Sequence, residues 1–369
     1  PDIVNEIQQP LAQNHSRTVT DKKIPPYDYL TAPSDLPPIA VERRPGELGE
    51  GYLFVSIFNF DSFGSVPGYA LILDNNGEPV YYDRPHGVPV AVDFKKQPNG
   101  LLTYSAPGPN TNGFFGLNNR YEIVDEYLAE GYTTDFHDLQ LLDNGNALLL
   151  IHDLQTVDMS KLTPGGSTEA PVIGCIIQEV DQDNKKLFQW RSWDYIDILD
   201  TNRPLDDDPL RYIHCNSIEL DHDGHILISS RHLDEVTKIN RQTGDIIWRM
   251  GGRHNEFDFT NDYGFNYQHD ARRLANGNLT IYDNGVLHEP KHSRGIEYWV
   301  SESSRTVAKV AEFRNTPETY ALAMGNMQTL PNSNVVVGWG RSSAPILTEF
   351  DQAGTKLLEL TTEKRMATY

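Results

Sequence analysis

The chain has 369 residues, of which 52 are acidic and 31 are basic, so its formal net charge is −21 at pH 7. Proteins that bind nucleic acid need a basic face for the phosphates, so nucleic acid is excluded as an expected partner. The longest apolar stretches span only about six residues, far fewer than the roughly 20 that cross a bilayer. No membrane span is therefore predicted.

Residues 1–50 differ in composition from the rest of the chain. They are rich in proline, above all between residues 25 and 45, and they lack the alternation of a β-strand. This composition predicts an extended N-terminal arm that lies over the remaining domain or is partly disordered. The chain begins at Pro1 without an initiator Met or an apolar leader, which predicts a processed or trimmed protein.

From residue 52 onward the sequence repeats a hairpin pattern. Residues 52–83 contain two strand-like stretches around a loop rich in Gly and Pro. Five further units each have a strand, a tight turn and a second strand, since the turn residues accept the positive φ that hairpins need. The turns are Asn99-Gly100, Asn144-Gly145, Asp223-Gly224, Asn276-Gly277 and Asn332-Ser333.

The downstream half of several units predicts two more strands. Residues 176–190, 236–250 and 346–360 each read as a strand, a turn and a strand. Insertions are expected between about 153 and 172 and near 200–212, where the spacing between turns is largest. Six units of about 53 residues match the size of four-stranded propeller blades. The expected fold is all-β, a six-bladed β-propeller over residues 51–369 that follows the extended Pro-rich arm.

Three histidines occupy similar places in successive units. His137 and His269 each stand seven residues before an Asn-Gly turn, and His214 stands nine before Asp223-Gly224. The innermost strand of each blade lines the propeller channel, so these side chains are predicted to converge at one mouth as catalytic residues. Three histidines also suit an open zinc site, but the close ligand spacing of zinc motifs is lacking. We therefore expect no metal.

Other side chains are predicted to share this rim. Arg231 ends a second strand, and its fork of donors suits sulfate, phosphate or carboxylate; a salt bridge is the structural alternative. Asn216 lies two residues after His214, on the same strand face. The remaining candidates for substrate binding are also explicable as turn chemistry or packing. They are His152, Tyr282, Trp339, Arg341 and Phe115.

Several linked motifs resemble those of the arylsulfotransferase-like propellers that act without a nucleotide sulfate donor. They are FHDLQLLDNGNALL, IHCNSIELDHDGHILISSRH, TGDIIWRMGG and QHDARRLANGN, and the likeness covers about residues 50–360. The resemblance implies that an aryl sulfate gives its sulfuryl group to His269, which passes it to a phenol, with no cofactor. It further implies that His137, His214, Asn216 and Arg231 surround the sulfuryl oxygens.

The sequence also departs from this family. Bacterial periplasmic members have a separate N-terminal β-domain, and the shorter architecture here looks more like fungal secreted members. In the last unit Gly338, Trp339 and Arg341 stand where other polar residues are expected. These departures affect the identity assigned to the transferred group more than the expected fold.

Two other functions stay open from the sequence. The same histidines could act by proton transfer on a phenolic substrate, dehydrating it to a quinone methide or orienting it for a (hetero-)Diels–Alder cycloaddition. A non-enzymatic propeller that binds a protein or glycan is the third possibility. The clustered ionisable residues favour an enzyme of secondary metabolism acting on an aromatic small molecule.

Two features bear on the cellular compartment. Asn14 and Asn278 each begin an N-glycosylation sequon, which favours a secreted protein or one in the secretory lumen. Cys175 and Cys215 are the only cysteines in the sequence. A bridge between them would stabilise the fold by roughly 3–4 kcal/mol, and two buried free thiols are the equal alternative.

Overall fold

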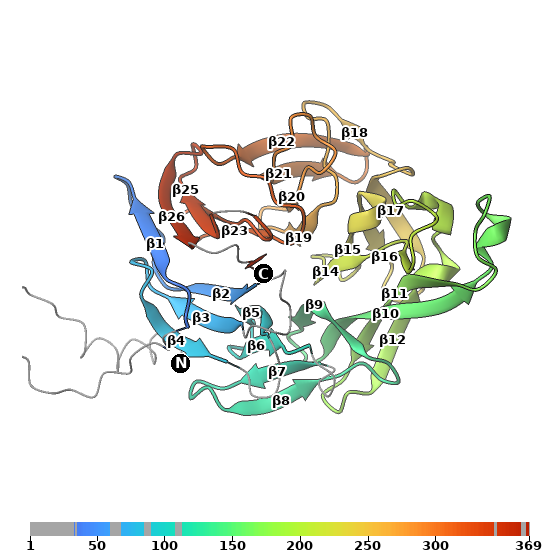
Figure 1. Cartoon of the computed structure of the whole chain (residues 1–369), viewed down its shortest axis with the longest axis horizontal. Coiled ribbons are helices and arrows are strands. Elements are labelled where there is room, and N and C mark those ends of the chain that lie inside the picture. The colour runs from blue at the N-terminus through green and yellow to red at the C-terminus, as the bar shows by residue number, and fades with distance from the viewer. Residues whose placement is uncertain are drawn as a thin grey trace, which may run out of the picture.

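Six small, mainly antiparallel sheets surround a common centre, as Figure 1 shows. This computed structural model describes residues 33, 35–59, 68–84, 90–107, 113–342, 345–362 and 367–368. The all-β, six-bladed propeller expected from the hairpin repeats is confirmed. Among the described residues, no helix has the length and apolar character of a membrane span.

The first three blades follow one another in chain order. Blade 1 contains β2 (Leu53–Phe58), β3 (Tyr69–Leu73) and β4 (Pro79–Asp83). Blade 2 contains β5 (Val92–Lys96), β6 (Leu102–Ser105), β7 (Phe114–Leu117) and β8 (Ile123–Tyr127). Blade 3 contains β9 (Thr134–Leu141), β10 (Ala147–Val157), β11 (Ala170–Val180) and β12 (Lys186–Arg191), with β13 (Leu210–Arg211) added beside β11.

The last three blades complete the ring. Blade 4 contains β14 (Cys215–Leu220), β15 (Ile226–Ser230), β16 (Glu235–Ile239) and β17 (Ile246–Gly251). Blade 5 contains β19 (His269–Arg273), β20 (Leu279–Asp283), β21 (Arg294–Ser301) and β22 (Thr306–Phe313), with β18 (Asp258–Phe259) on its outer edge. Blade 6 contains β23 (Asn326–Thr329), β24 (Val335–Gly338), β25 (Leu347–Phe350) and β26 (Lys356–Thr362). The predicted outer strands are therefore the third and fourth strands of blades 3, 4 and 6.

Both ends of the propeller chain help to close the ring. The C-terminal strand β27 (Ala367–Thr368) pairs with β2 and becomes the inner strand of blade 1. The N-terminal strand β1 (Ile39–Arg43) pairs with β26 on the outer edge of blade 6. These arm residues thus form an edge strand although their sequence lacks the alternation of one. Ile39 and Val41 pack against the core of blade 6, and this burial outweighs the weak strand pattern of the segment.

The five predicted turns share one structure. In each, the fourth turn residue has a positive φ, as for Gly145 at 85° and Ser333 at 69°. The preceding Asn or Asp accepts a hydrogen bond from the amide two residues later, as from Asn146 N to Asn144 Oδ1 over 3.0 Å. This side-chain bond holds the turn closed, which explains the repeated Asn-Gly and Asp-Gly pairs.

The inner strands of four blades are tied together by a buried carboxylate. Asp138 accepts hydrogen bonds from Lys95 of blade 2 over 2.5 Å and from Arg272 of blade 5 over 2.8 Å. It also accepts one from the amide of Ile218 in blade 4 over 2.7 Å. Because burial makes a broken pair costly, this network fixes the inner strands relative to one another.

The sequons and cysteines have definite places where the structure describes them. Asn14 lies outside the described residues. Asn278 follows the turn before β20, and its Nδ2 donates to Glu297 Oε1 over 2.6 Å. Cys175 and Cys215 are buried free thiols in blades 3 and 4. Burial first, and then the neighbouring Cys215, raises the pKa of the Cys175 thiol well above its usual value.

Candidate active site

The three predicted histidines come from the inner strands of three consecutive blades. His137 lies on β9, His214 immediately precedes β14, and His269 begins β19. The rings of His137 and His214 lie 4.9 Å apart between centroids in an edge-on arrangement. His269 is close enough to both rings for their charges to influence one another. The structure thus brings all three into one group.

The backbone is irregular at the starts of the inner strands that carry His214 and His269. His214 has a φ of 53°, and Asp270, next to His269, has a φ of 54°. Pairing of β14 with β15 and of β19 with β20 shifts register at these points. A left-handed backbone is uncommon outside glycine and carries strain. Here it turns the start of the strand out of the regular pleat and toward the centre.

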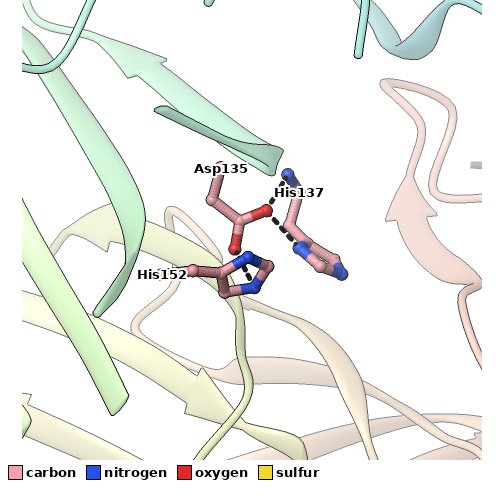
Figure 2. Close-up of side chains that lie close together, drawn as sticks. All are labelled: Asp135, His137 and His152. Atoms are coloured by element: carbon pink, nitrogen blue, oxygen red, sulfur yellow. Dashed lines mark hydrogen bonds and ion pairs between the residues drawn. The ribbon is translucent and has the colours of Figure 1, made fainter. Parts of the chain in front are cut away.

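Asp135 joins two imidazoles of blade 3, as Figure 2 shows. Its Oδ1 lies 2.6 Å from His137 Nδ1, and its Oδ2 lies 2.9 Å from His152 Nε2. Burial by itself opposes ionisation, but the charges and hydrogen bonds of the two histidines hold the pKa of Asp135 far below its usual value. The side chain is therefore a carboxylate that accepts from both rings.

A fourth imidazole, His232, lies beside His214, with 4.8 Å between ring centroids. Its Nδ1 lies 2.6 Å from the Arg211 carbonyl oxygen, and its Nε2 lies 2.7 Å from Arg231 Nη1. The guanidinium can only donate, so His232 accepts at Nε2 and donates from Nδ1. Burial first, and then the charge of Arg231, lowers the pKa of His232 to about 3. His232 is neutral at physiological pH.

His269 has a fully defined hydrogen-bond environment. Asn284 Nδ2 donates to the carbonyl oxygens of Ala321 and Met324 over 3.1 and 3.0 Å. Its Oδ1 therefore accepts, over 2.6 Å, the proton on His269 Nδ1. The opposite nitrogen, Nε2, accepts a hydrogen bond from the Met324 amide over 3.2 Å. Burial, followed by the charge of Arg231, lowers the pKa of His269 well below its usual value.

The segment that carries the Met324 amide is sharply bent. Met324 has a φ of 63°, and Gly325 has a φ of 98°. A Cβ at Gly325 would lie 2.3 Å from the ring of Tyr282, so only glycine fits against that ring. This close approach turns the Met324 amide toward His269.

Arg231 brings a buried cation to the group. It lies in a short 3₁₀ turn (Arg231–Leu233) and is 9% exposed. Nη2 donates to the Leu322 carbonyl over 2.9 Å, and the guanidinium stacks 4.7 Å from the Tyr267 ring centre. Its Nε has no hydrogen-bond partner among the described residues. Burial lowers the pKa of Arg231 to about 10, so it remains a cation at neutral pH.

His214 has a ring nitrogen that the described residues leave unpaired. Its Nδ1 is buried without a hydrogen-bond partner in the described part of the chain. Burial and the neighbouring His137 lower the pKa of His214 well below its usual value. An unpaired buried polar atom is costly and calls for an explanation. A ligand that bonds to His214 Nδ1 and Arg231 Nε would provide one.

The other predicted site residues are placed less centrally. Asn216 is buried and donates to the Gln268 carbonyl over 2.8 Å, which links blade 4 to the residue before His269. Tyr282 and Trp339 belong to the buried core between blades 5 and 6, where Tyr282 donates to the Trp339 carbonyl. Phe115 lies on the third strand of blade 2, and the Arg341 amide donates to Ala323. Of this binding set, His152 contacts Asp135, which is also the partner of His137, and the backbone of Tyr282 pairs with that of His269.

A metal could be held by Asp135, His137 and His152, whose ligand atoms lie within 4.8 Å of one another. Two ligands on one zinc ion, each about 2.0–2.1 Å from it, stand more than 3 Å apart in tetrahedral geometry. Asp135 Oδ1 and His137 Nδ1 are 2.6 Å apart. Arg211 Nη1 also lies 3.4 Å from His152 Nε2. The spacing of these three side chains is therefore that of hydrogen-bond partners next to the Arg211 cation, and it is too short for two ligands of one zinc ion.

Sequence reasoning did not select four contributors to the group, namely Asp135, His232, Asn284 and Met324. Asp135 is two residues before His137, which could have been noted because alternate residues of a strand share a face. Asn284 follows Asp283 at the end of β20, in the motif YDNG. The role of the Met324 amide has no side-chain signal, because it depends on the backbone bend.

Comparisons with known proteins agree with this architecture. A family model described as Arylsulfotransferase (ASST) matches residues 115–363, more than half of the chain. No curated protein matches this chain. A solved Bacteroides caccae protein of unknown function has a TM-score of 0.51 and 11% identity, covering 85% of this chain and 98% of that one. Its likeness concerns the fold alone.

Two further solved structures are more distant. Virginiamycin B lyase from Staphylococcus aureus has a TM-score of 0.42 and 10% identity, covering 90% of this chain and 98% of that one. The propeller domain of Myceliophteria thermophila Cps50 (Swd1) has a TM-score of 0.46 and 11% identity, covering 89% of this chain and 90% of that one. The family model includes the strands that carry His137, His214 and His269. The chain belongs to the arylsulfotransferase (ASST) family.

Proposed function

We propose that this protein transfers a sulfuryl group from an aryl sulfate to a phenol at the group formed by His137, His214, His269 and Arg231. The observation that carries the proposal is Arg231, a buried guanidinium with an unpartnered Nε beside imidazoles whose pKa values are lowered. A cation among neutral nitrogen bases suits an anionic group that must be bound and then attacked.

In the first half-reaction, His269 Nε2 attacks sulfur, and a nitrogen–sulfur bond forms. The bond from sulfur to the aryl oxygen breaks, and its electron pair leaves with the phenolate. The proton stays on His269 Nδ1 and remains hydrogen-bonded to Asn284 Oδ1, which stabilises the positive charge that develops on the ring. Arg231 faces the charge on the sulfuryl oxygens, as cations do in the related chemistry of phosphoryl transfer.

In the second half-reaction, the oxygen of an acceptor phenol attacks the sulfur. The nitrogen–sulfur bond breaks, and its electron pair returns to His269 Nε2. The phenol proton passes to an imidazole, for which His137 is the candidate because its Nδ1 is held by the Asp135 carboxylate at 2.6 Å. Both half-reactions require the Met324 amide to release Nε2, because a nitrogen lone pair cannot accept a hydrogen bond and attack sulfur together.

That hydrogen bond favours a second candidate function. If the Met324 amide stays on His269, the remaining chemistry is proton transfer by His137 and His214. Such a pair could remove a phenol proton and protonate a hydroxyl leaving group, dehydrating a phenolic alcohol to a quinone methide that can undergo cycloaddition. Arg231 would then orient a phenolate oxygen instead of a sulfuryl group.

The test is turnover of a simple aryl sulfate with a panel of phenol acceptors, measured by chromatography, beside turnover of sulfate-free phenolic alcohols. Sulfuryl transfer predicts a sulfated acceptor and stoichiometric release of the donor phenol. Transfer should persist in a chelating buffer, since the proposed steps use side chains only. Consumption of a phenolic alcohol without any sulfated acceptor would establish the second function instead.

A further inference from the structure

The carboxylate of Asp135 sits behind the group just described and serves two histidines at once. Asp135 is 4% exposed, and its two oxygens are engaged by His137 Nδ1 and His152 Nε2. Figure 2 shows the carboxylate between the two rings. The His152 side chain is 30% exposed and lies on β10, the next strand of the same blade. The carboxylate is thus anchored on both oxygens.

The hydrogen bond at Oδ1 determines which nitrogen of His137 carries a proton. A carboxylate only accepts, so the ring must donate from Nδ1. In the neutral ring the second nitrogen, Nε2, then has no proton and can accept one. His137 is stacked on Phe136, with 4.4 Å between ring centroids, which further limits the rotation of its ring.

The charged and titratable groups around His137 come from four elements. Asp135 is on its own strand, His152 is on β10, His214 precedes β14, and His269 begins β19. Of these, Asp135 alone is an anion. A proton arriving at His137 therefore lies beside the carboxylate of Asp135, whose Oδ1 is 2.6 Å from Nδ1.

We propose that Asp135 is a positioning residue that holds His137 in the Nδ1-protonated form, so that Nε2 accepts the proton of the phenolic substrate. The carboxylate also stabilises the imidazolium that this transfer creates, while its bond to His152 keeps it in place. The catalytic part of this inference rests on the proposed function, in either of its two forms. The tautomer of His137 does not, and it can be measured without a substrate.

The first test is nitrogen NMR of the protein with ¹⁵N-labelled histidine, without substrate, at a pH where His137 is neutral. His137→Gln identifies the resonances by their loss. The expected spectrum shows a protonated Nδ1 and an unprotonated Nε2 in wild type. In Asp135→Asn an NH₂ group replaces one of the two oxygens and cannot accept from the ring that faces it, so the preference for this tautomer should weaken. A neutral wild-type His137 with its proton on Nε2 would overturn the inference.

The second test compares kinetics in two charge-removing variants. Asp135→Asn should lower kcat by about 10²-fold or more, within the range of general acid–base catalysis, and leave KM within about threefold. Asp135→Glu should recover part of the loss. The matched control is Asp153→Asn, because Asp153 is also buried in blade 3 but bonds to Arg191 and Gln155. The control should retain kcat.

The outcomes separate the two claims. If wild type turns over neither an aryl sulfate nor a phenolic alcohol, the proposed function fails and the NMR result still decides the tautomer. If wild type is active and Asp135→Asn keeps its kcat, the positioning role is refuted whatever the tautomer. Equal losses in Asp135→Asn and Asp153→Asn would show that both act through stability alone, which would also refute it.

Discussion

The Met324 amide donates a hydrogen bond to Nε2 of His269 over 3.2 Å. The family resemblance assigns the sulfuryl group to this same histidine, so the nitrogen that would attack is engaged by the backbone. In the same segment, Arg231 donates a hydrogen bond to the Leu322 carbonyl, and Asn284 donates to the carbonyls of residues 321 and 324. We infer that binding of an aryl sulfate at Arg231 competes with the Leu322 carbonyl and so loosens the Met324 amide.

Replacing His269 with Asn should abolish turnover of an aryl sulfate. The shorter amide can still form a hydrogen bond but cannot attack sulfur or carry a sulfuryl group. Steady-state rates for wild type and variant, together with circular dichroism and thermal unfolding, test this. A folded His269→Asn protein with rates near those of wild type would eliminate His269 as the acceptor.

Arg231→Lys should weaken binding of sulfate ion and aryl sulfates by about tenfold or more. The ammonium keeps the charge but cannot reproduce the two-donor fork or stack in the same way on Tyr267. Isothermal titration with sulfate and with a slow aryl sulfate measures the effect. Arg44→Lys, at an exposed arginine paired with Glu42 outside the site, is the comparison variant. Unchanged affinity in Arg231→Lys would place the anion elsewhere.

Asn284→Ala should destabilise the protein by roughly 1–3 kcal/mol and reduce activity further than that loss explains. It leaves the buried Met324 carbonyl without its Asn284 donor and the Ala321 carbonyl with only the longer bond from Ser293 Oγ, and it removes the acceptor of His269 Nδ1. Chemical denaturation gives the free energy of unfolding, and rates under fully folded conditions isolate the activity. Wild-type stability in the variant would show that these hydrogen bonds contribute little.

The free energy of unfolding should fall when the pH is lowered from 6 to 4, partly because of His232. Burial lowers the pKa of His232 to about 3, whereas an unfolded histidine has a pKa near 6.5. Its contribution is fully present above about pH 6.5 and is lost as acid protonates the unfolded chain first. His232→Gln, although less stable at pH 8, should reduce this slope by about 1.4 kcal/mol per pH unit. An identical slope in denaturant titrations of both proteins would contradict the buried neutral state.

Both cysteines should be protected thiols in the folded protein. Cys175 and Cys215 are 3% and 2% exposed. Burial and the adjacent Cys215 raise the pKa of Cys175, and a thiol that stays protonated reacts slowly with alkylating reagents. Mass spectrometry of protein alkylated before and after unfolding should find none and then two modified cysteines. A mass showing a disulfide before any reductant is added would contradict the free-thiol structure.

Much of the fold could be predicted from the sequence because its signals are local. The Asn-Gly and Asp-Gly turns fix where each inner hairpin reverses, and the side-chain bond of Asn144 to the chain shows why those residues recur. The way in which the ring closes was harder to predict from the sequence. The pairing of β1 with β26 and of β27 with β2 joins segments far apart in sequence, and neither short strand has a strong pattern of its own.

The site was only partly predictable for the same reason. Similar spacing before the turns pointed to His137, His214 and His269, since it reflects strand register. Asp270 and the positive φ of His214 show that the strands are irregular there, which spacing alone does not reveal. Second-strand ends such as Tyr282 looked similar in sequence, but its ring packs against Trp339 in the core. Backbone donors such as Met324 depend on tertiary structure.

The most direct test of sulfuryl transfer is mass spectrometry of the protein quenched during turnover of an aryl sulfate without an acceptor. The account predicts a sulfuryl adduct on the peptide that contains His269, its loss when a phenol is added, and its absence in His269→Asn. Turnover to a sulfated phenol without any adduct on wild type, or an adduct on a peptide lacking His269, would contradict it.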